Sequence, residues 1–299
     1  MRRLLIIGCG DVGLRLIPLA RPRYRVYALT RDAKQCASLR ALGVTPVAGD
    51  LDHPQSLSAI AGIAHDVVHL APPPSQGVAD TRTAHLIAAL GKRRNKNSSG
   101  SLPQHFVYIS TSGVYGDCGG DIVPETRPAH PQTARAQRRM DAEQRLRAWG
   151  VRSGVQVSIL RVPGIYAADR LPLARLERGT PALLDADDSY VNHVHADDLA
   201  RMVIAALNHA SPGRAYNAVD DLPQKMGEYF DLVADRHGLK RPPRVARDEA
   251  QRVIPKNLRS FMGESRRLTN QRIKQELRFR LRYPSVLEGI GLAPGKLGT

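Results

Sequence analysis

The chain of 299 residues contains few cysteines, few aromatic residues and no long apolar segment. Its three cysteines, Cys9, Cys36 and Cys118, are widely spaced and odd in number, so they suggest neither a disulfide framework nor a zinc site, and we expect no metal. A reducing cytoplasm is the natural compartment for such a chain. No stretch approaches the roughly 18 apolar residues that cross a bilayer, which argues against a membrane protein.

Acidic residues are scarce relative to basic ones, with 28 Asp and Glu against 44 Lys and Arg, so the formal net charge is +16. Much of the excess lies between Lys240 and Arg282, a stretch with 14 basic and 4 acidic residues. Only 5% of all residues are aromatic, and no helix-turn-helix, zinc-finger or RNA-binding signature appears. We therefore expect a solvated basic surface and no nucleic-acid partner; a basic face that attracts an anionic substrate or cofactor is the alternative.

Short apolar runs alternate with longer segments of helical period in the first half of the chain. This alternation predicts an α/β fold, a doubly wound parallel sheet covered by helices on both faces. Residues 91–104 lack apolar periodicity and are predicted to form a mobile insertion. The predicted strands are residues 3–8, 24–30, 45–50, 65–71, 105–110 and 155–161. The predicted helices are residues 11–22, 32–43, 54–63, 80–93 and 133–150.

The motif "GCGDVG" follows the first predicted strand and opens the first helix. In this context G-x-G-x-x-G indicates a dinucleotide-binding site. Gly8 would allow the tight turn, Gly10 would let a pyrophosphate approach the backbone, and Gly13 would let the helix pack on the sheet. The N–H groups at the helix start, around Asp11 and Val12, would face the phosphates.

The end of the second predicted strand, "ALTRDA", bears on the choice of cofactor. Thr30 and Arg31 stand where an NAD site usually offers an acid to the ribose hydroxyls, and a guanidinium suits a 2′-phosphate. NADP is therefore the preferred cofactor. The alternative is NAD, with Asp32 serving the ribose.

Two later strand ends complete the expected cofactor site. Asp50 and Leu51 end the third predicted strand and would lie near the adenine. Leu70 and Ala71 end the fourth strand and would pass beneath the cofactor.

Several further motifs carry a resemblance to a known family. Together with the glycine motif, they resemble an atypical extended short-chain dehydrogenase/reductase of the NAD-dependent epimerase/dehydratase family, and specifically its YeeZ-like branch. The motifs are "ISTSGVYG" (109–116), "LRVPGIY" (160–166), "VNHVHADDLARMVIAAL" (191–207), "YNAVDDLP" (216–223) and "RRLTNQRIKQELRFRLRYPSVLEGI" (266–290).

The resemblance implies a Rossmann domain over residues 1–161 that binds the dinucleotide. Residues 162–299 would form mainly a smaller C-terminal substrate-binding region, with parts of 191–220 returning to the Rossmann domain. Ser110 and Pro163 would contact the cofactor. Such proteins commonly pair through two helices, so a homodimer that uses residues 133–149 is expected.

The resemblance also assigns the catalytic positions. Thr111 takes the place of the hydroxyl that holds the substrate oxygen, with Ser112 beside it. The usual tyrosine and lysine, four residues apart, are absent: Arg135 stands in the tyrosine position and Arg139 in the lysine position. A guanidinium stays protonated, so Arg135 can donate hydrogen bonds and stabilise an oxyanion but cannot readily transfer the proton, whereas Arg139 can still hold a ribose or phosphate.

Another group must then supply the proton, and two candidates stand out. Tyr115 follows the same strand end and is the first; a tyrosine that packs near the nicotinamide is the alternative. His193 has a suitable ordinary pKa and lies in a segment that faces the substrate in relatives. His195 is expected to make a buried structural hydrogen bond.

Two classes of function follow from these residues. The first is an NAD(P)-dependent oxidoreductase or epimerase acting on a hydroxyl or carbonyl group of a small molecule, such as a sugar or nucleotide sugar. The second is a redox-sensing or regulatory protein that binds the dinucleotide as a ligand. Nucleic-acid binding is a distant third and would show a steep dependence on salt.

Overall fold

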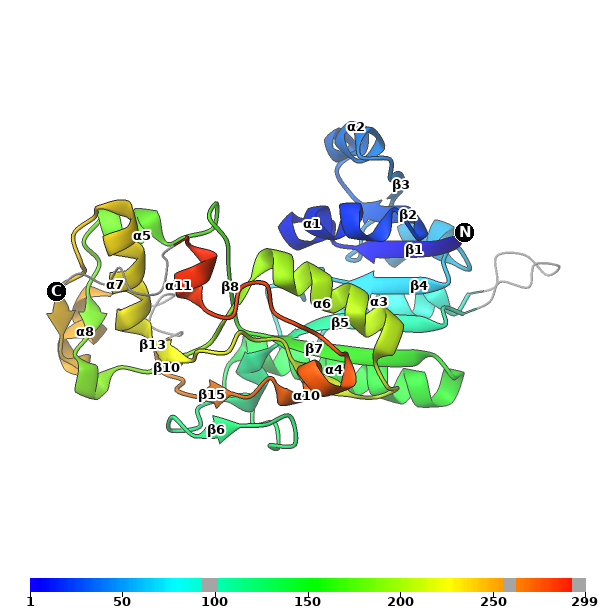
Figure 1. Cartoon of the computed structure of the whole chain (residues 1–299). Coiled ribbons are helices and arrows are strands. Elements are labelled where there is room, and N and C mark those ends of the chain that lie inside the picture. The colour runs from blue at the N-terminus through cyan, green and yellow to red at the C-terminus, as the bar shows by residue number, and fades with distance from the viewer. Residues whose placement is uncertain (93–101, 255–261, 292–299) are drawn as a thin grey trace.

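A seven-stranded parallel sheet forms the centre of the computed structural model, which describes residues 1–92, 102–254 and 262–291 (Figure 1). The strand order is β12-β7-β5-β4-β1-β2-β3, and every neighbouring pair is parallel. Its strands are β1 (Arg2–Ile7), β2 (Tyr24–Thr30), β3 (Thr45–Ala48), β4 (Asp66–His69), β5 (His105–Thr111), β7 (Gln156–Val162) and β12 (Ala215–Asn217). This order is the doubly wound Rossmann arrangement, so the predicted fold class is confirmed.

The strand order reverses between β1 and β4, and ligands of such sheets bind at this switch point, outside the carboxyl ends of the strands. The central strands are apolar on both faces because helices cover both sides. In β1, for example, the side chains from Leu4 to Ile7 are all fully buried. Residues 93–101 of the predicted mobile insertion lie outside the described residues.

Helices cover the sheet in two layers. On one face α1 (Asp11–Ala20) packs against α6 (Ala196–His209). On the other face α3 (Thr81–Leu90) packs against α4 (Ala134–Ser153), while α2 (Ala33–Ala41) follows the sheet edge at β2 and β3.

The predicted helix at 54–63 is instead a 3₁₀ helix, η1 (Pro54–Ile60). Its two fully buried side chains, Leu57 and Ile60, are three residues apart. This spacing matches the three-residue turn of a 3₁₀ helix, so one narrow apolar edge contacts the core. The α-helical prediction was wrong because so short a segment does not distinguish the two periods.

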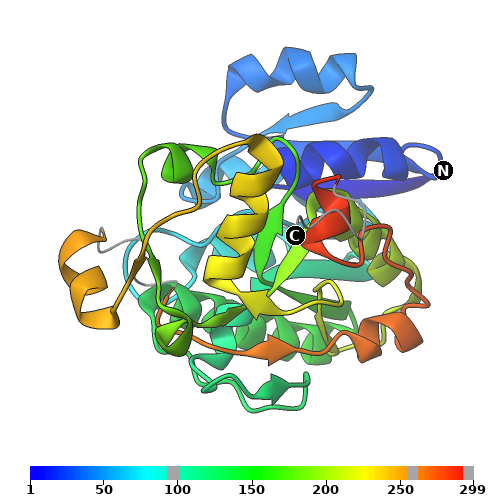
Figure 2. The same ribbon diagram turned by 60° about the vertical axis from the view of Figure 1, so that its left-hand side comes forward.

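A smaller lobe lies beyond the carboxyl ends of the strands, on the left of Figure 1, and Figure 2 turns it toward the viewer. It holds α5 (Leu173–Glu177), α7 (Met226–His237), α8 (Arg247–Val253) and α11 (Val286–Gly289), with the two-stranded pairs β9 (Ala182–Leu183) with β14 (Arg244–Val245) and β10 (Tyr190–Val191) with β13 (Gln224–Lys225). Four aromatic and aliphatic side chains of α7 and its neighbours, Tyr166, Leu176, Phe230 and Val233, form part of its core.

Short elements connect the lobe to the sheet. The 3₁₀ helix η2 follows β5 directly and brings the end of that strand toward the smaller lobe. These elements are η2 (Ser112–Tyr115), β6 (Ile122–Val123), β8 (Gly164–Tyr166), η3 (Asp185–Asp187), β11 (His193–His195), β15 (Arg267–Leu268) and α10 (Gln271–Glu276).

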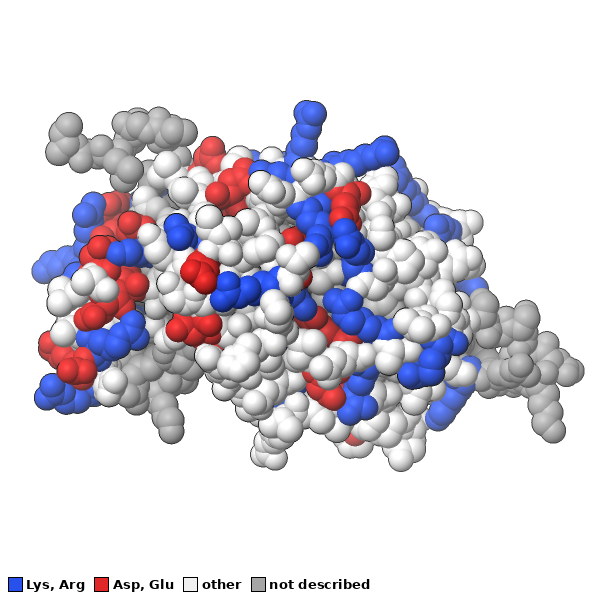
Figure 3. Space-filling model, turned by 90° about the horizontal axis from the view of Figure 1, so that it is seen from below, with Lys and Arg blue, Asp and Glu red and all other residues white. Residues whose placement is uncertain are grey.

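Charged side chains of both signs lie on the face of the molecule that is seen from below in Figure 3. Figure 3 shows basic side chains dispersed over the face seen from below, with acidic ones between them and no single uninterrupted basic patch. Within the described part of the chain, no helix is long and apolar enough to cross a membrane.

Asp198 at the start of α6 fixes the C-terminal segment to the sheet layer. This side chain is fully buried, and its Oδ2 accepts the backbone N–H groups of Arg282 and Tyr283, each at 2.8 Å. Its other oxygen accepts a hydrogen bond from Arg201. One carboxylate therefore holds the chain segment that leads to α11.

We predict that Asp198→Ala lowers the free energy of unfolding by about 2–4 kcal/mol, because it leaves buried N–H donors and a guanidinium without their acceptor. The measurement is urea unfolding followed by circular dichroism. Asp248→Ala, at an exposed position of α8, is the control and should change stability by less than about 0.5 kcal/mol. Equal effects of the two substitutions would contradict the anchoring role.

Candidate functional site

The glycine loop between β1 and α1 forms the first part of the site. Gly8 has φ +87°, and a Cβ there would lie 2.5 Å from the backbone nitrogen of Ala71, so no side chain fits. A Cβ on Gly10 would meet nothing within 4 Å, which leaves open space above the loop. At Gly13 a Cβ would lie 3.3 Å from the Sγ of Cys9, so α1 packs closely on the loop.

The amino end of α1 can receive an anion. Gly10 caps the helix with no side-chain hydrogen bond, so the first N–H groups face the open space above the loop. The side chain of Asp11 turns elsewhere, with Oδ1 3.0 Å from Arg15 and Oδ2 2.7 Å from Arg170. Burial alone would raise the pKa of Asp11, but the hydrogen bonds from Arg170 and Arg15 outweigh it and lower this pKa. Val12 packs against the core.

A groove of about 420 Å³ runs from the glycine loop along the ends of β2 and β3. It is lined by Gly8, Gly10, Thr30, Arg31, Asp32, Asp50, Leu51, Leu70, Ala71 and Arg82, together with neighbouring loop residues. The structure therefore brings the predicted residues of three strand ends to one groove.

Gln35 holds the floor of this groove and was missed at the level of sequence. Thr30 donates its hydroxyl to Gln35 Oε1 at 2.8 Å, and Gln35 Nε2 donates to the carbonyl of Cys9 at 2.9 Å. The hydroxyl of Thr30 is thus engaged within the protein. Asp32 caps α2 by accepting the N–H of Lys34 at 2.8 Å.

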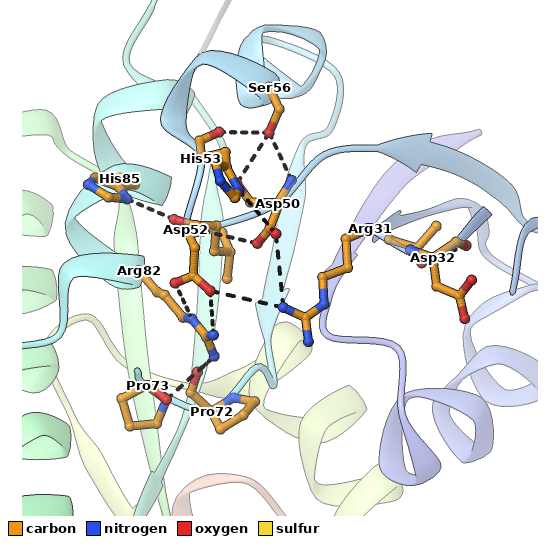
Figure 4. Close-up of polar contacts among 12 residues, drawn as sticks. Arg31, Asp32, Asp50, Asp52, His53, Ser56, Pro72, Pro73, Arg82 and His85 are labelled. Carbon is orange, nitrogen blue, oxygen red and sulfur yellow. Dashed lines mark hydrogen bonds and ion pairs between the residues drawn. The ribbon is translucent and has the colours of Figure 1, made fainter. Parts of the chain in front are cut away.

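Arg31 reaches across the mouth of the groove toward two carboxylates (Figure 4). Its Nη1 lies 3.9 Å from Asp50 Oδ2 and 4.0 Å from Asp52 Oδ2, and its side chain is 67% exposed. Asp52 instead makes a two-pronged pair with Arg82, at 2.7 and 2.6 Å. Arg82 also donates to the carbonyl of Pro72 at 3.1 Å. Because Asp52 is satisfied by Arg82, Arg31 keeps only loose contacts.

Arg135, Arg139 and Glu143 of α4 are spaced four apart and therefore lie on one side of the helix. Glu143 is fully buried; it accepts the hydroxyl of Ser110 at 2.6 Å and the guanidinium of Arg161 at 2.8 Å. Burial alone would lower the pKa of Arg161, but Glu143 outweighs it and raises this pKa. Ser110 was expected to contact a cofactor; its hydroxyl donates to the buried carboxylate of Glu143, and the residue also lines the cavity described next.

Arg139, one helical turn before Glu143, binds the end of the sheet. Its Nη1 donates to the carbonyl of Ile109 at 2.7 Å and to the hydroxyl of Tyr108 at 3.1 Å. Its side chain also lines a cavity of about 310 Å³ at the ends of β4, β5 and β7. The other lining residues of this strand-end cavity include Pro72, Thr111, Arg135 and Pro163.

A second cavity, of about 290 Å³, lies between the strand ends and the smaller lobe, and we call it the inner cavity. Thr111, Arg135 and Pro163 line this cavity as well as the strand-end cavity. The Oγ1 of Thr111 accepts the N–H of Gly113 at 3.2 Å, which leaves its own hydroxyl proton available to donate. Ser112 lines the inner cavity beside it.

Tyr115, the first candidate for the proton donor, is not among the residues that line the strand-end cavity or the inner cavity. Its side chain is 2% exposed, and its hydroxyl donates to Asn217 Oδ1 at 2.8 Å. The guanidinium of Arg161 lies 4.7 Å from the centre of its ring. The backbone turn of η2 directs this ring into the core, where it packs with Val114 and Val123.

His193 lines the inner cavity and is 6% exposed. Its ring stacks on Tyr229 with the centroids 4.2 Å apart. Burial lowers the pKa of His193 to about 4, so the ring is neutral at neutral pH. His195, by contrast, caps α6 by accepting the N–H of Asp197 at 3.2 Å.

Residues of the smaller lobe complete the inner cavity, and sequence motifs did not identify their role there. Tyr229, Phe230 and Met226 of α7 form an apolar wall. Glu264 and Arg266 form a charged end and pair with each other at 2.7 Å.

Comparisons with known proteins agree with this architecture. A solved structure of a functionally unknown conserved protein from Silicibacter pomeroyi is 27% identical, with 97% of each chain covered and a TM-score of 0.77. UDP-glucose 4-epimerase from Thermotoga maritima, solved with UDP-glucose, is 18% identical over 97% of this chain and 96% of that chain, with a TM-score of 0.75. UDP-glucuronic acid 4-epimerase from Bacillus cereus, solved with NAD, is 17% identical over 96% of each chain, with a TM-score of 0.74. The last two show a shared fold. Among curated proteins, none matches the chain.

A family model described as the NAD dependent epimerase/dehydratase family matches residues 4–218. The match runs from β1 through β12 and so covers the whole central sheet with the glycine loop and Thr111. The narrower YeeZ-like branch stays a prediction. The chain belongs to the NAD-dependent epimerase/dehydratase family.

Proposed function

We propose that the protein is an NADP-dependent oxidoreductase or epimerase that acts on a hydroxyl or carbonyl group of a small molecule. The observation that carries this proposal is that the glycine-loop groove, the strand-end cavity and the inner cavity share lining residues and so form one continuous path. Pro72 lines both the glycine-loop groove and the strand-end cavity, while Thr111 and Arg135 line both the strand-end cavity and the inner cavity. A dinucleotide along this path would meet a substrate beside Thr111.

The residues of the path fit the parts of a dinucleotide. The uncapped start of α1 would hold the diphosphate, near Gly10 and the N–H groups of Asp11 and Val12. The adenosine would lie between the Thr30 and Asp50 strand ends, which include Arg31 and Leu51. The nicotinamide end would lie in the strand-end cavity, beyond Leu70 and Ala71 and near Pro163 and Arg139. When bound, the cofactor supplies the hydride acceptor for oxidation of a hydroxyl to a carbonyl.

Three side chains of the inner cavity would each have a separate role in the reaction of the substrate. Thr111 holds the reacting oxygen through its hydroxyl. His193, neutral because of its burial, accepts the proton that the substrate hydroxyl loses, and it returns that proton in the reverse direction. Arg135 stays protonated and stabilises negative charge on the substrate.

Arg31 favours NADP over NAD. A 2′-phosphate would replace the loose carboxylate contacts of Arg31, at 3.9 and 4.0 Å, with charge-assisted hydrogen bonds. Asp50 and Asp52 would oppose the phosphate, but Arg82 already neutralises Asp52. Asp32 is engaged as the cap of α2, which weakens the alternative in which it binds the ribose of NAD.

The identity of the small molecule rests on the relatives. The Thermotoga maritima relative is a UDP-glucose epimerase, so sugars and nucleotide sugars are the first compounds to test. We further propose that residues 1–161 bind the cofactor, that residues 162–299 mainly bind the substrate, and that α4 takes part in a homodimer.

A regulatory protein that binds the dinucleotide without reacting is the second candidate. It is favoured by the contacts of Arg139, whose guanidinium donates to Ile109 and Tyr108 within the protein. Reduction of NADP⁺ by any of a panel of sugars, nucleotide sugars and small alcohols would exclude this candidate. A panel with no turnover, together with a cofactor-dependent change in affinity for a protein partner, would favour it.

We predict that Arg31→Gln raises the Kd for NADPH about tenfold or more and leaves the Kd for NADH nearly unchanged, because only NADPH carries the 2′-phosphate. Titration of the nicotinamide fluorescence measures both constants. Arg127→Gln, in a surface pair with Asp121, is the matched control. Tighter binding of NADH than of NADPH by the unsubstituted protein would refute the preference for NADP.

We predict that His193→Gln lowers kcat about 10²–10⁴-fold and leaves NADPH affinity unchanged, since only proton transfer is lost. Because burial lowers the pKa of His193 to about 4, its neutral form dominates from pH 6 to pH 8, and the oxidation rate should show no step from His193 there. The rate should fall as the pH drops through about 4. Steady-state assays across this range provide the measurement, with the exposed His209→Gln as control. A full rate in His193→Gln would remove this residue from the mechanism.

A further inference from the structure

The inner cavity has one charged end and one apolar side. Arg135, Arg266 and Glu264 form the charged end, and Met226 and Phe230 belong to the apolar side. Its volume of about 290 Å³ is at the lower limit of small-molecule sites, which typically measure about 300–1,000 Å³. The cavity thus suits a small ligand that is polar at one end.

Positive charge exceeds negative charge at this end. Glu264 is the one carboxylate among the described residues that line the cavity, and it faces two guanidinium groups. It pairs directly with Arg266 at 2.7 Å, and Arg266 also donates to the carbonyl of Gly116. Burial lowers the pKa of Arg135; Glu264 raises it, and nearby Arg138, Arg139 and Arg266 lower it. Among the described residues that line the cavity, two guanidinium groups thus accompany one carboxylate, so this end would attract an anionic group of a ligand.

The position of Arg135 on α4 supports the same conclusion. This residue lies in the first turn of the helix, two residues after the capping Thr133, and the first turn contains no acidic side chain. A cation at this end opposes the helix dipole, so it does not serve the stability of the helix. An anion there would be favoured by both the guanidinium and the dipole.

From these contacts we propose that the substrate carries an oxyanion, a carboxylate or a phosphate, close to its reacting carbon, and that Arg135 binds it with support from Arg266. Arg135 and Thr111 line the same two cavities, so an anion held by Arg135 lies within a few bonds of an oxygen held by Thr111. The planar guanidinium can bind such a group through two parallel hydrogen bonds. This inference rests on the proposed function, because it names the substrate class of the same site.

Isothermal titration of oxalate and of inorganic phosphate into the protein saturated with NADPH tests the proposal. The unsubstituted protein should bind at least one of the two anions, and Arg135→Gln should bind it at least tenfold more weakly. The anion affinity of Arg135→Lys should lie between those of the unsubstituted protein and Arg135→Gln, because lysine keeps the charge but loses the two-pronged geometry. Arg152→Gln, at an exposed position of the same helix, should bind as the unsubstituted protein does. The preferred anion distinguishes a carboxylate substrate from a phosphate substrate.

The proposal is overturned if neither anion binds to the unsubstituted protein, whether or not glucose binds. It is also overturned if Arg135→Gln binds the anion as tightly as the unsubstituted protein does. The NADPH affinity of each variant reports whether it folds, and Arg266→Gln, which should also weaken anion binding, replaces Arg135→Gln if that variant does not fold. The same titrations without NADPH separate this inference from the proposed function. If the protein has no affinity for NADPH but binds an anion through Arg135, the proposed anion site is supported and the proposed cofactor is contradicted.

Discussion

The buried contact of Glu143 with Ser110 and Arg161 sets the geometry of the whole site. It joins the middle of α4 to the ends of β5 and β7, the sheet strands that precede and follow this helix in the chain. A carboxylate without its partners at this depth would be strongly unfavourable, so α4 has a single position along the sheet. Since residues four apart lie on one face of a helix, Glu143 also directs Arg139 toward the strand ends and Arg135 toward the two cavities. The proposed chemistry depends on this register.

Arg139 and Arg135 differ in what they contact and therefore in the role that we propose for each. Arg139 is held by backbone carbonyl and tyrosine oxygens of β5, so it stabilises the strand end where a mobile lysine would reach a ligand. Arg135 lies further out, at the junction of the two cavities, and introduces a permanent positive charge beside Thr111. A permanent cation suits an anionic substrate better than it suits proton transfer. In the proposed mechanism His193 accepts the proton; its burial beside the ring of Tyr229 lowers its pKa and keeps it neutral.

Much of the central sheet could be predicted from sequence because its signals are local. Runs such as Leu4–Ile7 are apolar on both faces, and the glycine motif directly follows the first of them. Side-chain directions could not be predicted in the same way. The hydroxyls of Ser110 and Tyr115 bond to Glu143 and Asn217, which stand 33 and 102 residues later in the chain, so no local pattern predicts these contacts. Gln35, Arg82, Glu264 and Arg266 were missed for a related reason: their roles arise only when distant loops and helices meet.

A crystal structure of the protein with NADPH tests the central claim most directly. We predict that the diphosphate lies at the first turn of α1, that the 2′-phosphate contacts Arg31, and that the nicotinamide lies in the strand-end cavity beside Thr111. A nicotinamide bound away from Thr111, or a glycine loop that receives no diphosphate at saturating NADPH, would contradict the account.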